Sequence, residues 1–333
     1  MASATRILNR EDARTEVARH VSLPTIRDIV DEGTSLLGRV NQTLGGGGTP
    51  PAAHRALLLL FRHAVELADG FDELIEEGVV TPAGLQVRAI LEAHMQMLYL
   101  MGRRVQSPAA NPLGNAKDPV PRDAAGAALH GTPLLDALND RGEAYLVLEI
   151  RRQVATAHLY RAGSLAAWFA ETTGRSTLPG KTVDQQVQTE LAAEESRLRA
   201  LLAESHRAPI DAEYTRVRGA KHHDPNWFTL FGGPRSVREL SRSVGLAFQY
   251  DMLYAETSRT MHGVDVSGQL GPASAAGVQS IAPLRDFRNL GYLVRSFMIH
   301  MVQIYALVVE MLRPGDMPQH HQWVQRWLTP QLP

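Results

Sequence analysis

The segment AGLQVRAILEAHMQMLYLMG, residues 83–102, decides the fold because its apolar side chains recur with the period of an α-helix. Leucine, isoleucine, methionine and alanine dominate the segment, as expected for a helix that packs against several others. Arg88, Glu92 and His94 nevertheless lie within it, where an isolated buried charge would cost several kcal/mol. These three side chains therefore belong either to a structural network or to a functional site.

The segments around it have the same helical character. Residues 52–78 form a second long apolar segment that ends at Gly78, and together with residues 79–102 they predict an antiparallel helical hairpin. No alternating strand pattern and no internal repeat occurs. We therefore expect an all-α fold, a bundle of long antiparallel helices. Further helices are predicted at residues 23–44, 142–174, 182–206, 246–263 and 284–315, with a short one at 234–245.

Glycine and proline divide the chain into regions. Residues 1–51 contain N-terminal helices and a linker, GGGGTPP, and residues 52–315 are expected to form a single helical domain. Within that domain, residues 104–140 are rich in Pro, Gly and Ala and predict a long irregular excursion. Residues 316–333 are expected to form a short C-terminal helix and tail.

The composition excludes several classes of protein. The chain has 333 residues, of which 44% are hydrophobic and 21% charged, as in soluble globular proteins. It has no cysteine, which excludes disulfides, a thiolate nucleophile and a cysteine zinc site. Its formal net charge is −1, so binding to nucleic acid would need a local basic patch.

One segment is apolar enough to suggest a membrane span. Arg295, His300 and Glu310 interrupt residues 284–315, which favours a buried helix of a soluble protein without membrane partners. The first residues carry charges where a secretion signal needs an apolar core. We therefore predict a cytoplasmic protein.

Arg88 and Glu92 are the first candidate site, because they lie four residues apart on one face of a helix. One interpretation is an ion pair that locks helices together. The other makes Arg88 a clamp for an anion and Glu92 its orienting partner or a general base.

A second polar stripe lies in residues 250–263. Tyr250, Tyr254, Ser258 and His262 recur every four residues and so share one face of the expected helix. They form either a ladder of satisfied hydrogen bonds or a site in which Ser258 and His262 act as nucleophile and base. No GxSxG motif supports a serine hydrolase.

The third candidate is a loop, GAKHHDPNWFTLFGG, residues 219–233. Lys221, His222, His223 and Asp224 precede Trp227 there, and loops often carry function. The alternative is a solvated loop that Trp227 anchors to the core.

Metal chemistry has only weak support. The Glu-x-x-His pattern of helical di-metal sites and the HExxH motif are both absent. His63, Glu66, Glu92 and His94 could still meet across the predicted hairpin. We expect no metal and no cofactor.

Two blocks of the sequence resemble a bacterial helical family, the one catalogued as domain of unknown function 5677. They are LFRHAVELADGFDELIEEG with VRAILEAHMQMLYL, and NWFTLFGGPRSVRELSRSVG with QYDMLYAETSRTMHG. The likeness covers roughly residues 55–265. It implies that both polar patches lie in one domain and converge. The residues on which this resemblance depends are Arg88, Glu92, Trp227, Tyr250, Tyr254, Ser258 and His262.

A looser similarity is to the HEPN class of helical ribonucleases, which use an Arg and a His a few residues apart on a helix. In that class the His acts on the ribose 2′-hydroxyl and the Arg stabilises phosphate charge. The pairs here with suitable spacing are Arg88–His94, Arg152–His158 and Arg295–His300.

Three functions are compatible with these patterns, and the sequence leaves open whether the protein is an enzyme. The first is a metal-independent nuclease or effector acting on RNA or a nucleotide-like anion. Arg88, Glu92, Ser258 and His262 would be catalytic, with His262 or His94 moving the proton. The second is a non-catalytic binding module that forms a homo-oligomer through residues 182–206, and the third is a metal-dependent enzyme. Residues expected to contribute to binding are His94, Tyr250, Tyr254, Lys221 and Trp227.

Overall fold

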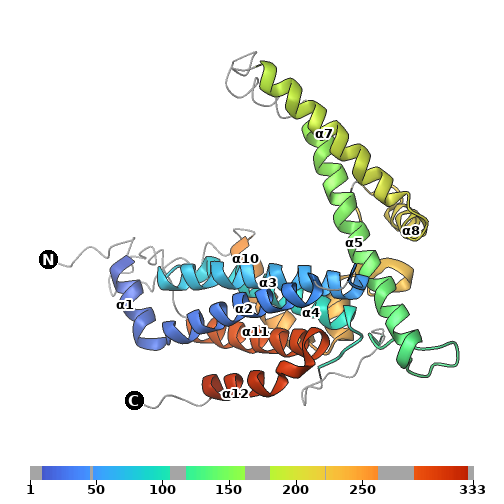
Figure 1. Ribbon diagram of the computed structural model, residues 1–333. Coiled ribbons are helices and arrows are strands. Elements are labelled where there is room, and N and C mark those ends of the chain that lie inside the picture. Colours follow the sequence, from blue (N-terminus) through green and yellow to red (C-terminus); the bar gives the residue numbers. More distant parts are fainter. Residues whose placement is uncertain are drawn as a thin grey trace.

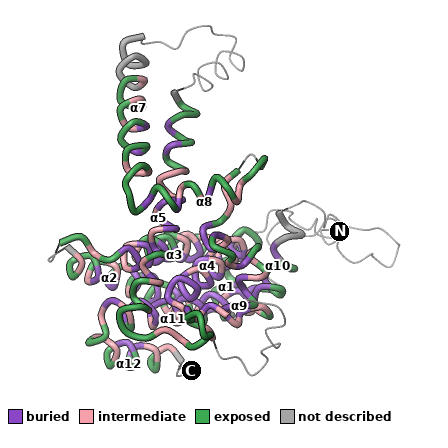
Figure 2. The backbone as a smooth tube through the Cα atoms, turned by 90° about the vertical axis from the view of Figure 1, so that its right-hand side faces the viewer, coloured by how far each residue is buried: buried purple, intermediate pink, exposed green. Residues whose placement is uncertain are grey.

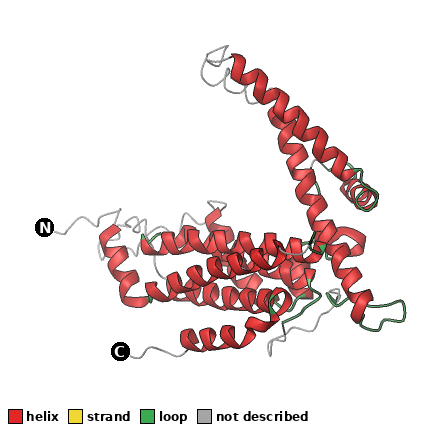
Figure 3. Ribbon diagram, in the orientation of Figure 1, coloured by secondary structure: helices red, strands yellow, loops and turns green. Residues whose placement is uncertain are grey.

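The computed structural model describes residues 10–45, 48–105, 118–161, 181–221, 223–261 and 289–328, and these fold mainly into helices (Figure 3). Within those ranges no strand forms, and an isolated bridge joins Arg122 to Ala128. The predicted all-α class is confirmed. In chain order the elements are α1 (Arg10–His20), α2 (Leu23–Gly45), α3 (Ala52–Glu76), α4 (Val80–Leu100), α5 (Gly131–Arg161), α7 (Lys181–Leu202), α8 (Ala208–Arg218), η1 (Trp227–Gly232), α9 (Val237–Ser243), α10 (Ala247–Met261), α11 (Leu290–Leu312), η3 (Pro314–Asp316) and α12 (Met317–Leu328).

The core lies where α3, α4 and α11 pack against one another (Figure 1). A short turn joins α3 to α4, and Gly78 within it has a positive φ of 70°, which glycine adopts without strain. The Phe71 ring stacks on Phe297 with centroids 4.3 Å apart, and Phe61 meets Tyr305 edge to face at 5.7 Å. These contacts join segments that are more than two hundred residues apart in the chain.

The N-terminal helix α2 belongs to the same core, because its apolar face is buried against α3 and α11. The Tyr305 hydroxyl of α11 donates a hydrogen bond to the carbonyl of Ile29 at 2.8 Å. A Cβ at Gly33 would lie 2.2 Å from that hydroxyl oxygen. Glycine at position 33 therefore lets the two helices approach closely.

Helix α11 is long and apolar enough to span a membrane by length and composition alone. It lies inside the helical body, however, and Phe297, His300 and Tyr305 on it are buried (Figure 2). The buried face of α11 thus packs against other helices of the protein, which is consistent with the prediction of a buried helix in a soluble bundle.

A two-helix arm projects from this body (Figure 1). The N-terminal half of α5 packs on α3, where Arg55 pairs with Glu143 at 2.8 Å and the Asn139 side chain accepts from the amide of Ala53 at 3.2 Å. The rest of α5 leaves the body and packs along α7. Helix α8 and η1 lie where the arm meets the body.

Several predicted boundaries differ from the structure. Helix α5 begins at Gly131, inside the segment predicted as an irregular excursion, because Pro133 lies in its first turn, where a missing amide proton costs nothing. Helix α8 was not predicted, and α7 ends at Leu202 instead of residue 206.

Candidate functional site

The polar residues predicted on α4 and α10 do meet in part. The Arg88 guanidinium donates to Glu92 with Nε 3.1 Å from Oε1, and its Cζ lies 4.4 Å above the centre of the Tyr254 ring. The Tyr250 and Tyr254 rings are 5.3 Å apart. We call these four residues the α4–α10 cluster. Helical spacing places each pair on its own helix face, and the packing of α10 on α4 joins the two faces.

The α4–α10 cluster is partly exposed rather than sealed in the core. The Arg88 and Glu92 side chains are 22% and 31% exposed, so water reaches the ion pair. Burial and then the nearby Glu92 carboxylate raise the pKa of Tyr250, which keeps its phenol protonated. Of the other predicted members, the side chain of Ser258 and all of His262 lie outside the described residues. The cluster is thus a cation held between a carboxylate and an aromatic face.

His94 does not belong to this cluster, although it lies on the same helix. It is buried in the core, and its Nδ1 is 3.3 Å from Nδ1 of His300 on α11. Burial, and then the charge of its partner, lower the pKa of His94 well below 6.5, while burial lowers the pKa of His300 to about 4. Both rings are therefore neutral at pH 7 and face each other across α4 and α11. Without access to solvent, His94 cannot move a proton for the predicted nuclease.

The predicted metal ligands are also separated. His63 and Glu66 are exposed on α3, and Glu66 pairs with Arg62 at 2.7 Å. His94 instead is buried in the core, where it contacts His300. No group of three or more His, Cys, Asp or Glu positioned to hold a metal occurs within the described part of the chain.

Trp227 is buried and so serves as an anchor rather than as a contact for a ligand. Its indole Nε1 donates to the Gln96 side chain at 2.8 Å, and its ring packs near Tyr99 and against the edge of Tyr145. The loop residues before Trp227 are consequently held against the base of the arm. This corresponds to the interpretation of the 219–233 segment as a loop that Trp227 anchors.

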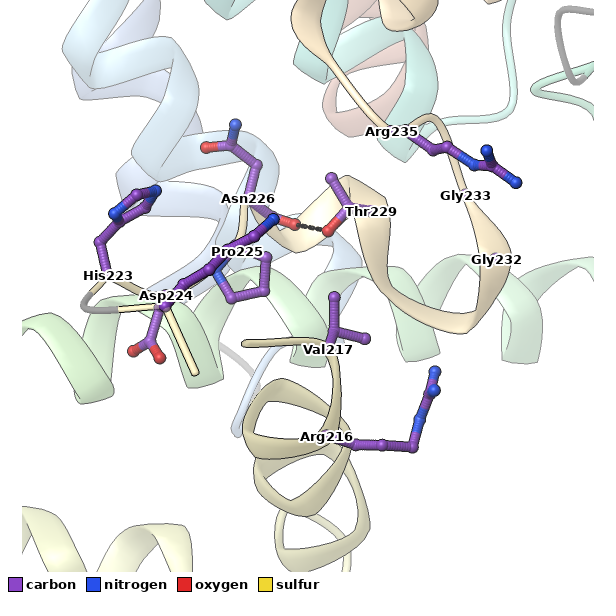
Figure 4. Close-up of a pocket in the computed structure, with 11 residues that line it drawn as sticks. Arg216, Val217, His223, Asp224, Pro225, Asn226, Thr229, Gly232, Gly233 and Arg235 are labelled. Atoms are coloured by element: carbon purple, nitrogen blue, oxygen red, sulfur yellow. Dashed lines mark hydrogen bonds between the residues drawn. The ribbon is translucent and has the colours of Figure 1, made fainter. Parts of the chain in front are cut away.

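A cavity of about 720 Å³ opens beside this anchored loop (Figure 4). We call it the arm-base pocket. Its lining comes from the end of α8, from the loop that follows, and from η1 and the segment after it. Its charged and histidine side chains are Arg216, Lys221, His223, Asp224 and Arg235.

The charges of the arm-base pocket are not balanced. Asp224 already accepts from Arg151, with Nε and Nη2 at 2.8 and 2.7 Å from its two oxygens, and this contact lowers the pKa of Asp224. Arg216 is held by both oxygens of Glu213. The side chains of Lys221 and Arg235 form no ion pair with any described residue, although the backbone amide of Arg235 donates to the Glu239 carboxylate at 2.8 Å. Their positive charges therefore remain available to an anion that enters the cavity.

Arg151 positions one wall of the pocket. Its guanidinium also pairs with Asp211 of α8 and lies 5.4 Å from the centre of the Tyr214 ring. One arginine of α5 thus connects the arm to α8 and to the loop that carries Asp224. Because both carboxylates accept from it, the loop has a defined position instead of a solvated one.

Sequence reasoning identified Lys221 and the loop but not Arg216 or Arg235. The signal was present as a run of basic residues, RVRGAKHH at 216–223, in a segment that was not assigned to a helix. Arg235 lies beyond Trp227 and enters the pocket only because η1 folds back. His222, the other histidine of the run, lies outside the described residues.

Comparison with family models, with curated proteins and with solved structures finds no match to this chain. The resemblances to the helical family and to the HEPN class therefore stay predictions.

Proposed function

We propose that this protein is a helical binding module that holds a phosphate-bearing ligand, RNA or a nucleotide-like anion, in the arm-base pocket. The observation that carries the proposal is the pair of cations, Lys221 and Arg235, that line one cavity and whose side chains form no ion pair among the described residues. With a net charge of −1 the chain attracts anions only where cations gather locally, as they do here.

The contacts around the pocket favour a phosphate over a simple carboxylate ligand. Arg216 is oriented by Glu213, and Lys221 supplies a compact ammonium donor from the loop. Guanidinium and ammonium groups that approach from different sides match the several oxygens of a phosphate group. Because Arg151 pairs with Asp224, the negative charge of the Asp224 carboxylate is partly neutralised and repels an incoming anion less.

The test is binding of a labelled ten-nucleotide single-stranded RNA, followed by fluorescence anisotropy at low and moderate salt. We expect binding that weakens as salt rises, and a loss of roughly three- to tenfold in affinity for Lys221→Ala and for Arg235→Ala. Arg62→Ala on α3 removes the same charge at a residue that does not line the pocket, and it should bind as the natural chain does. Equal binding by all four proteins, or no binding, would refute the proposal.

A metal-independent nuclease is a second candidate. The observation that favours it is the contact of Arg88 with Tyr254 of α10, because His262 directly follows that helix in the sequence. Arg88 would bind the phosphate and His262 would move the proton. Incubation with a mixed RNA pool tests it, comparing the natural chain with Arg88→Ala and His262→Ala. Intact RNA, or equal cutting by folded variants, removes this candidate.

A further inference from the structure

The arm-base pocket belongs to a segment of the chain that is strongly basic. Residues 216–242, which include the whole lining of the pocket, hold six basic and two acidic residues, a net charge of +4, whereas the net charge of the whole chain is −1. Three of the six basic residues line the cavity. Two others, Arg238 and Arg242, follow on α9. The positive charge of the segment therefore continues beyond the pocket.

Hydrogen bonds fix the pocket residue Arg235 to the beginning of α9. Its backbone amide donates to the Glu239 carboxylate at 2.8 Å, while the amide of Glu239 donates to the Ser236 hydroxyl at 3.1 Å. This pattern resembles a capping box, in which a glutamate side chain turns back to the backbone before its helix. Arg235 thus lies at the edge of the pocket (Figure 4) and directly before the first turn of α9.

Arg238 and Arg242 extend the line of cations along α9. They lie four residues apart on one helix face, with Cβ atoms about 6 Å apart, and both are exposed. Arg238 pairs with Asp251 of α10 at 3.3 Å, and both of these side chains are more than half exposed. An ion pair in water contributes little, so Arg238 can exchange Asp251 for another anion. We call Arg235, Arg238 and Arg242 the α9 row.

The α9 row matches a ligand whose negative charges repeat along its length. A nucleic-acid strand carries one phosphate on every nucleotide, and proteins that bind single strands follow its backbone with a line of cations. A nucleotide held in the pocket would therefore carry its neighbouring phosphates past Arg238 and Arg242 if it belonged to a strand. A free nucleotide has no charge that reaches beyond the cavity and would leave this part of the basic segment unused.

We infer that the ligand of the arm-base pocket is a strand of several nucleotides. One phosphate contacts Lys221 and Arg235, and the next phosphates along the strand contact Arg238 and Arg242. This inference rests on the proposed anion binding and names its ligand class.

The experiment compares the ten-nucleotide RNA, followed by fluorescence anisotropy, with uridine monophosphate, followed by titration calorimetry. We expect Arg242→Ala to lose roughly threefold in affinity for the RNA at low salt and nothing for uridine monophosphate. Its plot of the logarithm of the binding constant against the logarithm of salt concentration should be less steep by about 0.7, because one phosphate contact is lost. Arg242→Lys keeps the charge, and Arg62→Ala removes one on α3; both should bind as the natural chain does.

Two results would overturn the inference. One is RNA binding by Arg242→Ala that equals that of the natural chain at every salt concentration, while Lys221→Ala weakens binding; the proposed anion site would then stand and the strand would not. The other is competition by a ten-residue poly-glutamate peptide as strong as that by unlabelled RNA, which would make the ligand an acidic peptide. If neither probe binds to the natural chain, the proposed function itself fails.

Discussion

The buried pair His94 and His300 predicts that the fold loses stability in mild acid. In the folded chain burial lowers the pKa of His300 to about 4, whereas an unfolded chain titrates near the ordinary value of 6.5. Unfolding therefore takes up a proton once the pH falls below about 6.5. Stability from this group is complete above that pH, declines as the pH falls, and levels off below about 4.

The size of the effect follows from these two pKa values. A fall from 6.5 to about 4 corresponds to roughly 3 kcal/mol at the acid limit, and to about 2 kcal/mol at pH 5. His94 adds to the loss in the same direction, because burial and the neighbouring His300 lower its pKa further. A loss of 2 kcal/mol or more is a large share of the stability of an ordinary domain.

Urea unfolding at pH 7 and at pH 5 measures this loss, with the double variant His94→Gln, His300→Gln as the comparison. Glutamine is close to histidine in size and stays neutral, so the double variant should lose at least about 2 kcal/mol less between the two pH values. The half-buried His54 and His320 also have lowered pKa values and contribute a slope that the double variant retains. His63→Gln, an exposed control, should behave as the natural chain does. Equal losses in the natural chain and the double variant would refute the reasoning.

Three further predictions concern packing and ion pairs. Gly33→Ala places a Cβ against the Tyr305 hydroxyl and should destabilise the fold by roughly 1–3 kcal/mol in thermal or urea unfolding, whereas Gly38→Ala, with open space around it, should stabilise α2 by about 0.5–1 kcal/mol. The opposite order would contradict the close approach of α2 and α11. Arg88→Ala should cost only about 1 kcal/mol, because the pair with Glu92 is partly exposed to water and the contact with Tyr254 is a single cation–π interaction; a cost of 3 kcal/mol or more would show a sealed ion pair. Arg151→Met should cost roughly 2 kcal/mol and speed hydrogen exchange in residues 208–227, because Asp211 loses its partner and Asp224 keeps only its longer contact with Arg218; unchanged exchange there would show that Arg151 does not hold the loop.

Part of the candidate site followed from the sequence because it is local. Arg88 and Glu92 lie four residues apart on a helix, and so do Tyr250 and Tyr254, so that each pair was visible from spacing alone. Residue spacing does not predict that the two pairs meet between α4 and α10, because a helix face can pack against any neighbouring helix. His94 illustrates the limit. It lies two residues from Glu92, and the resulting rotation of about 200° around α4 directs it to the core and to His300.

The sequence by itself determined most of the long helical segments, though not α8, and the all-α class of the fold, because helical periodicity is set by side chains only three or four positions apart. It also determined that the chain lacks cysteine chemistry. The tertiary structure alone decided the projection of α5 and α7 as an arm, the burial of Trp227, and the gathering of Arg216, Lys221 and Arg235 around one cavity. Those features depend on contacts between residues far apart in the chain, and no local pattern encodes how two distant helices pack.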